Sequence, residues 1–262
     1  MQQLTFDILE NSPLAEDVFR LWLKAGTSEA CSALKSVKAG QFVNIGVKGC
    51  FLRRPISICD VEGERLCLVY KVVGKGTAIM ADMSVGEQVD MLLPLGNGFN
   101  IARSGAKPLL VGGGVGVPPL LLLFKQLKEA GKTADVVLGF NKRQDIILAD
   151  EFRRLGCEPI VATIDGSEGY KGFVTDALRN INANANNTYY YSCGPIGMLR
   201  AVKRELAIGG ELSMEERMGC GFGVCMGCTC HTQGGARQVC TDGPVFGSGE
   251  VIFEEASGQI LI

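Results

Sequence analysis

Four cysteines near the carboxyl end combine the residue type and the spacing best suited to chemistry. The sequence has 11 cysteines, and the pattern C-x4-C-x2-C, with a further cysteine after eleven residues, selects Cys220, Cys225, Cys228 and Cys240. This spacing is typical of plant-type [2Fe–2S] sites, in which four thiolates hold two irons bridged by sulfide. The sequence therefore predicts an iron–sulfur cluster in this segment.

Glycines separate these cysteines. Because glycine tolerates positive φ, Gly221, Gly223 and Gly227 would let the backbone curl tightly enough for the thiolates to converge. The same curl would leave backbone N–H groups pointing at sulfur, an interaction that tunes the reduction potential of a cluster. We therefore expect N–H···S hydrogen bonds within this loop.

Two other interpretations of the cysteines stay open. A disulfide framework requires an oxidising compartment, but the cysteine count is odd and no charged segment precedes an apolar run at the N-terminus, so we expect a cytoplasmic protein without a signal peptide. A zinc site could use Cys225, Cys228, Cys240 and His231, because C-x2-C is also a zinc spacing. Cys230 is a spare thiol that could replace Cys228, although the x4-x2 spacing would then be lost.

Composition and charge argue against several classes of partner. The chain has 262 residues, a formal net charge of −2, 47% hydrophobic residues and 21% charged residues, which is typical of a packed globular protein of about two domains. We see no basic patch suited to nucleic acid, and the apolar stretch 108–124 is too short to span a membrane. His231 is the only histidine, so acid–base hydrolysis is a poor fit, and we expect this residue on an exposed loop.

The first hundred residues alternate apolar and polar side chains in short runs separated by glycines and charges. These runs predict strands near residues 4–8, 19–23, 41–47, 55–59, 66–73 and 88–93, with one short helix near 76–83. Six short strands at this spacing predict a small antiparallel barrel over residues 1–101.

From about residue 105 the hydrophobic period changes. Apolar runs predict strands near 109–111, 136–140, 160–164 and 189–192, alternating with helices near 117–130, 148–155, 174–181 and 196–207. This alternation predicts a parallel sheet with helices on both faces over residues 102–208. The Asn-rich stretch 180–187 is expected to be a solvated loop, and a third segment, 209–262, contains the cysteine loop.

A glycine-rich turn follows the first strand of this sheet and opens a helix. The turn contains Gly112, Gly113, Gly114 and Gly116. Backbone N–H groups at such a turn can hold a pyrophosphate, although a tight strand-to-helix turn needs glycine even without a ligand. A second corner, Cys193-Gly194-Pro195, follows the last strand at the same edge of the sheet and therefore strengthens the nucleotide interpretation.

The predicted barrel carries another set of candidate ligands. Arg54 offers a planar donor fork suited to a pyrophosphate, and Ser57 on the same strand could present a hydroxyl to a flavin ring. Further along, Gly74, Gly76 and Thr77 can form a nest of amides for phosphate. Taken singly, each of these patterns is also compatible with an ordinary strand and turn.

The order of the motifs R-P-x-S, G-x-G-T, G-G-G-x-G-x-P-P and C-G-P resembles that of the ferredoxin–NADP reductase superfamily. The segment E-E-R-M-x-C-G-x-G-x-C-x-x-C is similar to one in the family of electron-transfer subunits of bacterial dihydroorotate dehydrogenase B. The resemblance covers nearly the whole chain, and the cysteine motif is its most specific part. It implies a six-stranded antiparallel FAD-binding barrel, a parallel-sheet NAD-binding domain and a small C-terminal [2Fe–2S] domain.

The resemblance also implies roles for individual residues. FAD would be held by Arg54, Pro55, Ile56, Ser57, Val69, Tyr70, Lys71, Gly76 and Thr77. NAD would be held by Gly112, Gly113, Gly114, Gly116, Cys193, Gly194 and Pro195. The cluster ligands would be Cys220, Cys225, Cys228 and Cys240.

The same resemblance implies a partner and a pathway. The partner would be a catalytic subunit of dihydroorotate dehydrogenase that contains FMN, in a heterotetramer with two copies of each subunit. Electrons would pass from that FMN through the cluster and FAD to NAD+ in de novo pyrimidine biosynthesis. Without the partner, this chain would only reduce other acceptors with NADH.

The sequence departs from the superfamily pattern in places. Ile56 stands where the superfamily often has a tyrosine against the flavin. The flavin ring would then be covered by Tyr70 or by another group, or it would be left uncovered. Lys142 and Arg143 follow the second sheet strand, where a 2′-phosphate could bind, so NADP stays open although the resemblance implies NAD.

The small subunit of a bifurcating NADH-dependent ferredoxin–NADP reductase is also similar but has Asp at the first ligand position, against Cys220 here. A sulfhydrogenase subunit and a zinc-stabilised interaction module are further alternatives.

Overall fold

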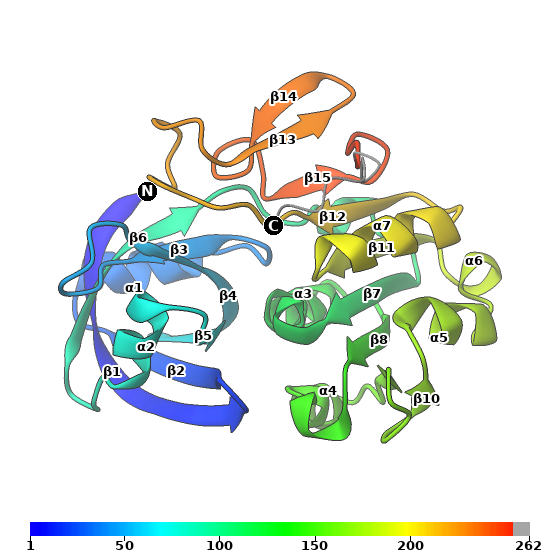
Figure 1. The fold of residues 1–262 in the computed structure, drawn as a ribbon, viewed down its shortest axis with the longest axis horizontal. Helices are drawn as coiled ribbons and strands as arrows, with labels where there is room; N and C mark the ends of the chain where they lie inside the picture. Colours follow the sequence, from blue (N-terminus) through cyan, green and yellow to red (C-terminus); the bar gives the residue numbers. More distant parts are fainter. Residues whose placement is uncertain (254–262) are drawn as a thin grey trace, which may run out of the picture.

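The computed structural model describes residues 1–253, and residues 254–262, the end of the expected third segment, lie outside the described part. An N-terminal barrel and an α/β domain lie side by side, and the C-terminal segment runs across the end of both (Figure 1). Among the described residues, no helix is both long and apolar enough to cross a membrane.

The N-terminal half is a closed six-stranded antiparallel barrel, which confirms the prediction. The strand order is β1-β2-β5-β4-β3-β6. The strands are β1 (Gln2–Ala15), β2 (Val18–Ala25), β3 (Phe42–Ile45), β4 (Arg54–Glu62), β5 (Arg65–Lys71) and β6 (Gln88–Leu95). Side chains alternate across a strand, so Phe6 and Ile8 of β1 and Leu21 and Leu23 of β2 are buried together inside. Their neighbours along the two strands are exposed, as Thr5 is, or half-buried, as Asp7 and Arg20 are.

Two helices lie against the barrel. The expected short helix is present as α2 (Lys75–Ala81), whereas α1 (Ser28–Lys35) was not expected from the pattern. A capping residue starts α1: the Thr27 hydroxyl accepts a hydrogen bond from the Ala30 N–H at 3.2 Å. Its apolar face is short, and Ala30 and Leu34 bury it against the barrel, which explains why hydrophobic periodicity alone missed it.

The second half contains a seven-stranded sheet in the order β10-β9-β8-β7-β11-β12-β15. The expected strands are β7 (Pro108–Gly113), β8 (Asp135–Phe140), β9 (Ile160–Thr163) and β11 (Tyr189–Cys193), and they pair in parallel. The short edge strand β10 (Tyr170–Lys171) pairs with β9. The expected helices are α3 (Pro118–Glu129), α4 (Ala149–Arg154), α5 (Val174–Asn180) and α7 (Ile196–Glu205).

Helices cover both faces of this sheet, as predicted. Leu110 and Leu138 pack in the core that contains α3 and α4 and continues into the barrel. Their strand neighbours Leu109 and Val137 pack in a second core with α5 and α7. Burial of both faces of parallel strands explains their nearly continuous apolar runs.

The Asn-rich stretch is not only a loop. It contains one short helical segment, α6 (Ala183–Asn186), which corrects the expectation for residues 180–187. Asn182 precedes it with φ of 51°, a left-handed conformation that asparagine tolerates better than most residues. The Asn186 side chain then donates to the Ile181 carbonyl at 2.8 Å, so local side-chain bonds stabilise this turn.

The C-terminal segment extends the sheet before and after the cysteine loop. Strand β12 (Gly210–Ser213) pairs in parallel with β11, and β15 (Val245–Gly247) pairs antiparallel with β12. Between them, β13 (Thr229–Thr232) and β14 (Gly235–Gln238) form a separate hairpin. The sheet therefore continues across the expected boundary at 208/209, and the three-domain division stays a proposal.

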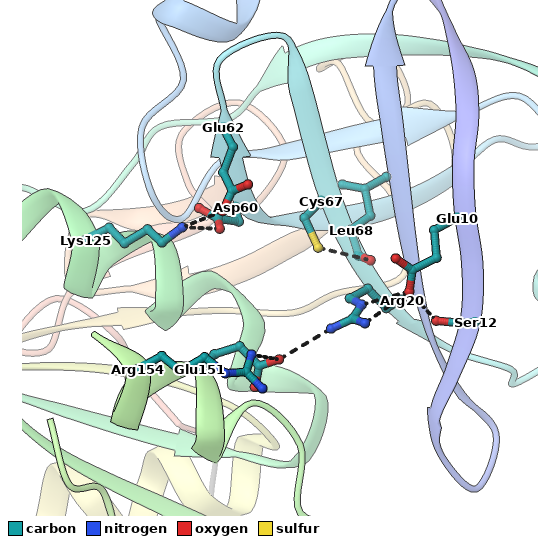
Figure 2. A network of polar contacts seen from close by, with 10 residues as sticks. All are labelled: Glu10, Ser12, Arg20, Asp60, Glu62, Cys67, Leu68, Lys125, Glu151 and Arg154. Carbon is teal, nitrogen blue, oxygen red and sulfur yellow. Dashed lines mark hydrogen bonds and ion pairs between the residues drawn. The ribbon is translucent and has the colours of Figure 1, made fainter. Parts of the chain in front are cut away.

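Polar contacts join the barrel to the α/β domain (Figure 2). Lys125 on α3 contacts the buried carboxylate of Asp60 on β4 and lies 3.3 Å from Glu62. Arg20 on β2 lies 3.4 Å from Glu151 on α4. Together with the shared apolar core, these contacts fix the two domains relative to each other.

Candidate functional site

The cysteine loop between β12 and β13, together with the turn after β14 that carries Cys240, brings the predicted thiols together in two pairs. The Cys220 N–H donates to Cys225 Sγ at 3.4 Å. Cys228 and Cys240 are 1% and 2% exposed, and they lie close enough for Cys228 to raise the pKa of the Cys240 thiol. The spare thiol, Cys230, is buried on β13. Cys228, and not Cys230, therefore pairs with Cys240.

Backbone N–H groups point at sulfur, as expected from the glycine-rich loop. Cys220 Sγ accepts from the N–H groups of Phe222 at 3.5 Å and Val224 at 3.3 Å. Burial opposes ionisation of Cys220, but these backbone donors lower the pKa of its thiol to about 6. The loop therefore stabilises a thiolate at this position, the form that binds iron.

The second pair lies in a different environment. Burial raises the pKa of Cys240 to about 12, and its neighbour Cys228 raises it further, while the Gly223 N–H opposes this shift. A buried thiol with a raised pKa is protonated at neutral pH, and binding of a metal ion would displace this proton.

The pairing of thiols distinguishes between metals. In the described part of the chain, no three His, Cys, Asp or Glu side chains are placed to share one metal ion. A structural zinc ion needs four converging donors, whereas a two-iron cluster takes two thiolates at each iron. His231 lies on strand β13 and is exposed, while its neighbour Cys230 is buried. The two pairs of thiols match the two irons of a [2Fe–2S] cluster, and the expectation of a loop position for His231 was wrong.

Two of the three glycines in the cysteine loop have the positive φ that was expected of them. Gly221 and Gly223 have φ of 78° and 96°. Gly227 does not have positive φ, and Met226 takes the left-handed conformation instead, with φ of 56°. A Cβ at Gly227 would make only ordinary contact with Cys225 Sγ, at 3.5 Å, so the role expected for this glycine was wrong.

Arg54 and the G-x-G-T turn meet on the barrel surface. A Cβ at Gly76 would lie 2.1 Å from Arg54 Nε, so the guanidinium packs directly on this glycine. The Thr77 hydroxyl accepts from the Val73 N–H at 2.9 Å and donates to the Gly74 carbonyl at 3.0 Å, which holds the turn in shape. A charged donor fork thus lies beside the first turn of α2, where N–H groups have no partner within the helix.

The other residues expected at FAD are spread along β4 and β5. Pro55, Ile56 and Ser57 are half-buried on β4; on β5, Val69 and Tyr70 are buried and Lys71 is exposed. The Tyr70 hydroxyl donates to Asn11 Oδ1 at 3.0 Å, and its ring stacks on Phe19 with centroids 5.8 Å apart. Burial raises the pKa of Tyr70 to about 12, so it stays neutral.

A cavity of about 870 Å³ lies between the barrel and the carboxyl edge of the sheet. Of the residues expected at NAD, Gly113, Gly114 and Pro195 line it, and Lys71 reaches it from the barrel. The sequence analysis did not assign the following lining residues: Ala15, Glu16, Asp17, Val18, Gly139, Phe140, Asn141, Asp145, Ile164, Phe173, Thr175 and Met198. They come from the β1–β2 hairpin, the end of β8 and the loop after it, the loop after β9, and the first turns of α5 and α7. In these segments only Lys142 and Arg143 had been noted from the sequence.

The remaining residues expected at NAD pack against the residues that line the cavity. A Cβ at Gly116 would lie 2.4 Å from the Cys193 carbonyl oxygen, so the two turns expected at NAD pack against each other. Gly112 packs on Val117, and Gly194 lies against Gly113. Cys193 is buried, and burial raises the pKa of its thiol to about 12. This cysteine therefore serves as a neutral packed thiol.

Carboxylates surround the two cations after β8. Lys142 lies 3.2 Å from Glu16 of the β1–β2 hairpin and 4.0 Å from Asp145. Arg143 lies 3.6 Å from Glu168. The positive charges noted from the sequence are thus paired with neighbouring carboxylates.

Comparisons with known proteins agree with this geometry. A family described as the iron–sulfur cluster binding domain of dihydroorotate dehydrogenase B matches residues 215–252, and an oxidoreductase NAD-binding domain matches residues 110–204. The solved NADH-dependent reduced ferredoxin–NADP oxidoreductase has a TM-score of 0.84 and 33% identity, covering 94% of this chain and 89% of that one. A ferredoxin NADP+ reductase from Neisseria gonorrhoeae with bound FAD and NADP has a TM-score of 0.66 and 18% identity, covering 78% and 90%, and shows the fold alone.

Fold and sites together define a reductase of the ferredoxin–NADP reductase type with an added iron–sulfur segment. Two dihydroorotate dehydrogenase B (NAD(+)) electron transfer subunits are 40% identical to this chain. The protein from Fusobacterium nucleatum covers 94% of this chain and 96% of its own length. The one from Bacillus cereus covers 97% and 100%. This chain belongs to the family of dihydroorotate dehydrogenase B electron transfer subunits, as its sequence motifs indicated.

Proposed function

We propose that this chain is the electron-transfer subunit of an NAD-dependent dihydroorotate dehydrogenase and passes electrons from a catalytic subunit to NAD+. The observation that carries the proposal is the arrangement of three candidate sites on one chain whose barrel and α/β domain share an apolar core. Paired thiols lie against the barrel, Arg54 lies on the barrel surface, and a nucleotide-sized cavity lies at the domain junction. A cytoplasmic location and a role in pyrimidine biosynthesis follow from this proposal.

The chain's own residues would position two cofactors. When bound, the [2Fe–2S] cluster exchanges single electrons and FAD exchanges them singly or in pairs, which joins a one-electron path to hydride exchange with NAD. Cys220 and Cys225 would hold one iron, and Cys228 and Cys240 the other. Arg54 would hold the FAD pyrophosphate beside Gly76, and half-buried Ser57 would offer its hydroxyl to the flavin edge.

The cavity would bind the nicotinamide nucleotide. Gly113 and Gly114 line the cavity and carry no side chain, so the backbone could approach the pyrophosphate there. A Cβ at Gly113 would also lie 2.4 Å from Met198 Sδ. Phe173 lines the cavity and is exposed, so its ring offers a face for stacking a base. Lys71 adds a positive charge on the barrel side of the cavity.

Charge at the rim favours NAD over NADP. The pKa of Lys142 is raised by Glu16 first, and then by Asp145 and Asp165. With Glu168 beside Arg143, carboxylates outnumber cations around this rim. An additional 2′-phosphate dianion would meet net repulsion there, whereas a ribose hydroxyl would not.

The partner would be an FMN-containing catalytic subunit, in a heterotetramer with two copies of each chain. Support comes from the cysteine loop, where Phe222, Val224 and Met226 are exposed apolar side chains. Apolar side chains gathered around a redox centre favour contact with another protein. Such a contact would let electrons enter close to the thiols.

Reconstitution tests this function. The chain should be co-expressed with the dihydroorotate dehydrogenase catalytic subunit, and the purified complex should reduce NAD+ with dihydroorotate. The chain alone should oxidise NADH with ferricyanide but leave dihydroorotate unchanged. A complex that oxidises dihydroorotate yet passes no electrons to NAD+ would refute the proposal.

A further inference from the structure

Strand β3 separates the barrel core from the cysteine loop. Val43 and Ile45 pack in the barrel core, whereas Phe42 packs in the core that contains Cys228 and Cys240. Because side chains alternate along a strand, Asn44 shares the face of Phe42 and points toward the C-terminal segment. This asparagine is only 1% exposed.

Asn44 is bonded to the cysteine loop at its first ligand position. Its Nδ2 donates to the Cys220 carbonyl oxygen at 2.8 Å. The carbonyl can only accept, so the nitrogen of the amide must face it. A Cβ at Gly221 would lie 2.6 Å from Nδ2, and Gly221 has φ of 78°. The Asn44 side chain can therefore reach the loop only because residue 221 is a glycine.

The other end of the same amide is unsatisfied. Asn44 Oδ1 is buried and has no hydrogen-bond partner within the described residues. A buried acceptor without a partner destabilises the fold relative to an apolar side chain of similar shape. A polar residue at this position therefore needs an explanation other than stability.

The position of β3 relative to β4 supplies that explanation. In the register of the two strands, Asn44 lies opposite Pro55 and Phe42 lies opposite Ser57. Side chains opposite each other in an antiparallel pair share one face, with Cβ atoms about 5 Å apart. Asn44 thus lies between the Cys220 loop and the strand that carries the candidate flavin ligands.

The backbone of Asn44 is itself held in place. Arg53 Nη1 donates to the Asn44 carbonyl at 3.3 Å, and Arg53 Nη2 bonds to Asp90 Oδ2 at 2.5 Å. These bonds tie β3, β4 and β6 together next to the amide. Movement of the Cys220 loop relative to β4 is therefore resisted at this one side chain.

We propose that Asn44 is a positioning residue that fixes the cysteine loop against the flavin-binding strand and so sets the geometry for electron exchange between the two sites. It acts through the Cys220 carbonyl, to which its Nδ2 donates. This inference rests on the proposed function, because it assumes a cluster at the cysteines and FAD at β4. It concerns transfer between these sites and leaves the NADH site unaffected.

The test compares Asn44→Leu with Asn187→Leu in the full chain loaded with cluster and FAD. Asn187 is a matched control, since it is also buried, donates from its Nδ2 to Asp135 at 2.9 Å and to the Lys107 carbonyl at 3.5 Å, and has an unpaired Oδ1. Iron and FAD content, the EPR spectrum of the reduced cluster, and stopped-flow reduction by NADH should be measured. Asn44→Asp, which keeps the size but removes the donor, serves if Asn44→Leu does not fold.

We expect Asn44→Leu to keep the wild-type rate of flavin reduction by NADH, to slow cluster reduction by about tenfold and to change the EPR line shape. Asn187→Leu should match wild type in all three. If Asn44→Leu and Asn44→Asp also match wild type in cluster reduction and EPR, the inference is wrong. If the wild-type chain contains no iron or no FAD, the proposed function is wrong, and this inference fails with it.

Discussion

The ammonium group of Lys125 on α3 contacts the carboxylate of Asp60 on β4, whose side chain is only 5% exposed at the junction of barrel and α/β domain (Figure 2). Glu62 lies 3.3 Å from the same ammonium group. Burial raises the pKa of Asp60, and Lys125 opposes that shift. The contact therefore offsets part of the cost of burying this carboxylate at the interface between the proposed FAD and NAD domains.

Lys125→Met should destabilise the chain by about 3 kcal/mol at neutral pH, because it leaves the Asp60 carboxylate unpaired. The pKa of Asp60 is already raised in the folded state and should rise further in the variant. Stability is lost as pH rises through that raised pKa, so the deficit should shrink as the solution is acidified below it. Urea unfolding at neutral and acidic pH measures this. Lys128→Met, on the same helix with an exposed ammonium group, is the control, and an equal deficit at both pH values would contradict the assignment.

Cys225→Ala should abolish the iron–sulfur absorption and the EPR signal of the reduced chain while FAD remains bound, because the barrel is a separate part of the fold. Cys230→Ala is the matched control, since Cys228 and not Cys230 pairs with Cys240. Iron analysis and visible spectroscopy of both variants provide the measurement. Loss of iron in Cys230→Ala with full iron in Cys225→Ala would reverse the ligand assignment.

Arg54→Ala should weaken FAD binding by about 10- to 100-fold, since a charged hydrogen-bond partner is worth about 1.5–3 kcal/mol. Gly76→Ala should have a similar effect, because its Cβ would lie 2.1 Å from Arg54 Nε and displace the guanidinium. Gly249→Ala is the control, as a Cβ there meets nothing within 4 Å, its φ is not positive, and this glycine has no role expected at FAD. Flavin occupancy after gel filtration, followed by titration of apoprotein with FAD, decides between these outcomes.

Glu16→Gln and Asp145→Asn should each increase the use of NADPH relative to NADH. An exposed charge contact is worth up to about 1 kcal/mol, so each change should alter the ratio of kcat/KM by up to about fivefold at low salt. Glu64→Gln, on an exposed barrel turn remote from the cavity lining, is the control. Steady-state ferricyanide reduction at low and high salt gives the ratios. Unchanged ratios would show that this rim does not select the nucleotide.

Strong local patterns made much of the fold predictable. Alternating apolar residues gave the six barrel strands, and continuous apolar runs gave the parallel strands. Helix α1 was missed because its apolar face is short and depends on a Thr27 cap. Strands β12 and β15 were missed because Gly210–Ser213 and Val245–Gly247 are too short to show a period and pair only through contacts distant in sequence.

The candidate sites also contain residues that the sequence singled out and residues that only the packing brings together. Spacing was enough to single out Cys220 and its partners, because a cluster loop is local in sequence. The cavity residues Glu16 and Met198 had no such signal, since only the packing of the β1–β2 hairpin and α7 around the carboxyl edge brings them together. The contact of Asn44 with Cys220 spans 176 residues, so no local pattern could have indicated it.

Anaerobic titration of the purified full chain with NADH, followed by visible and EPR spectroscopy, tests the account most directly. We expect iron and FAD in a ratio of about two to one, bleaching of the flavin by NADH, and then an EPR signal from the reduced cluster. A chain that contains both cofactors but whose cluster stays oxidised with excess NADH would contradict the proposed electron path.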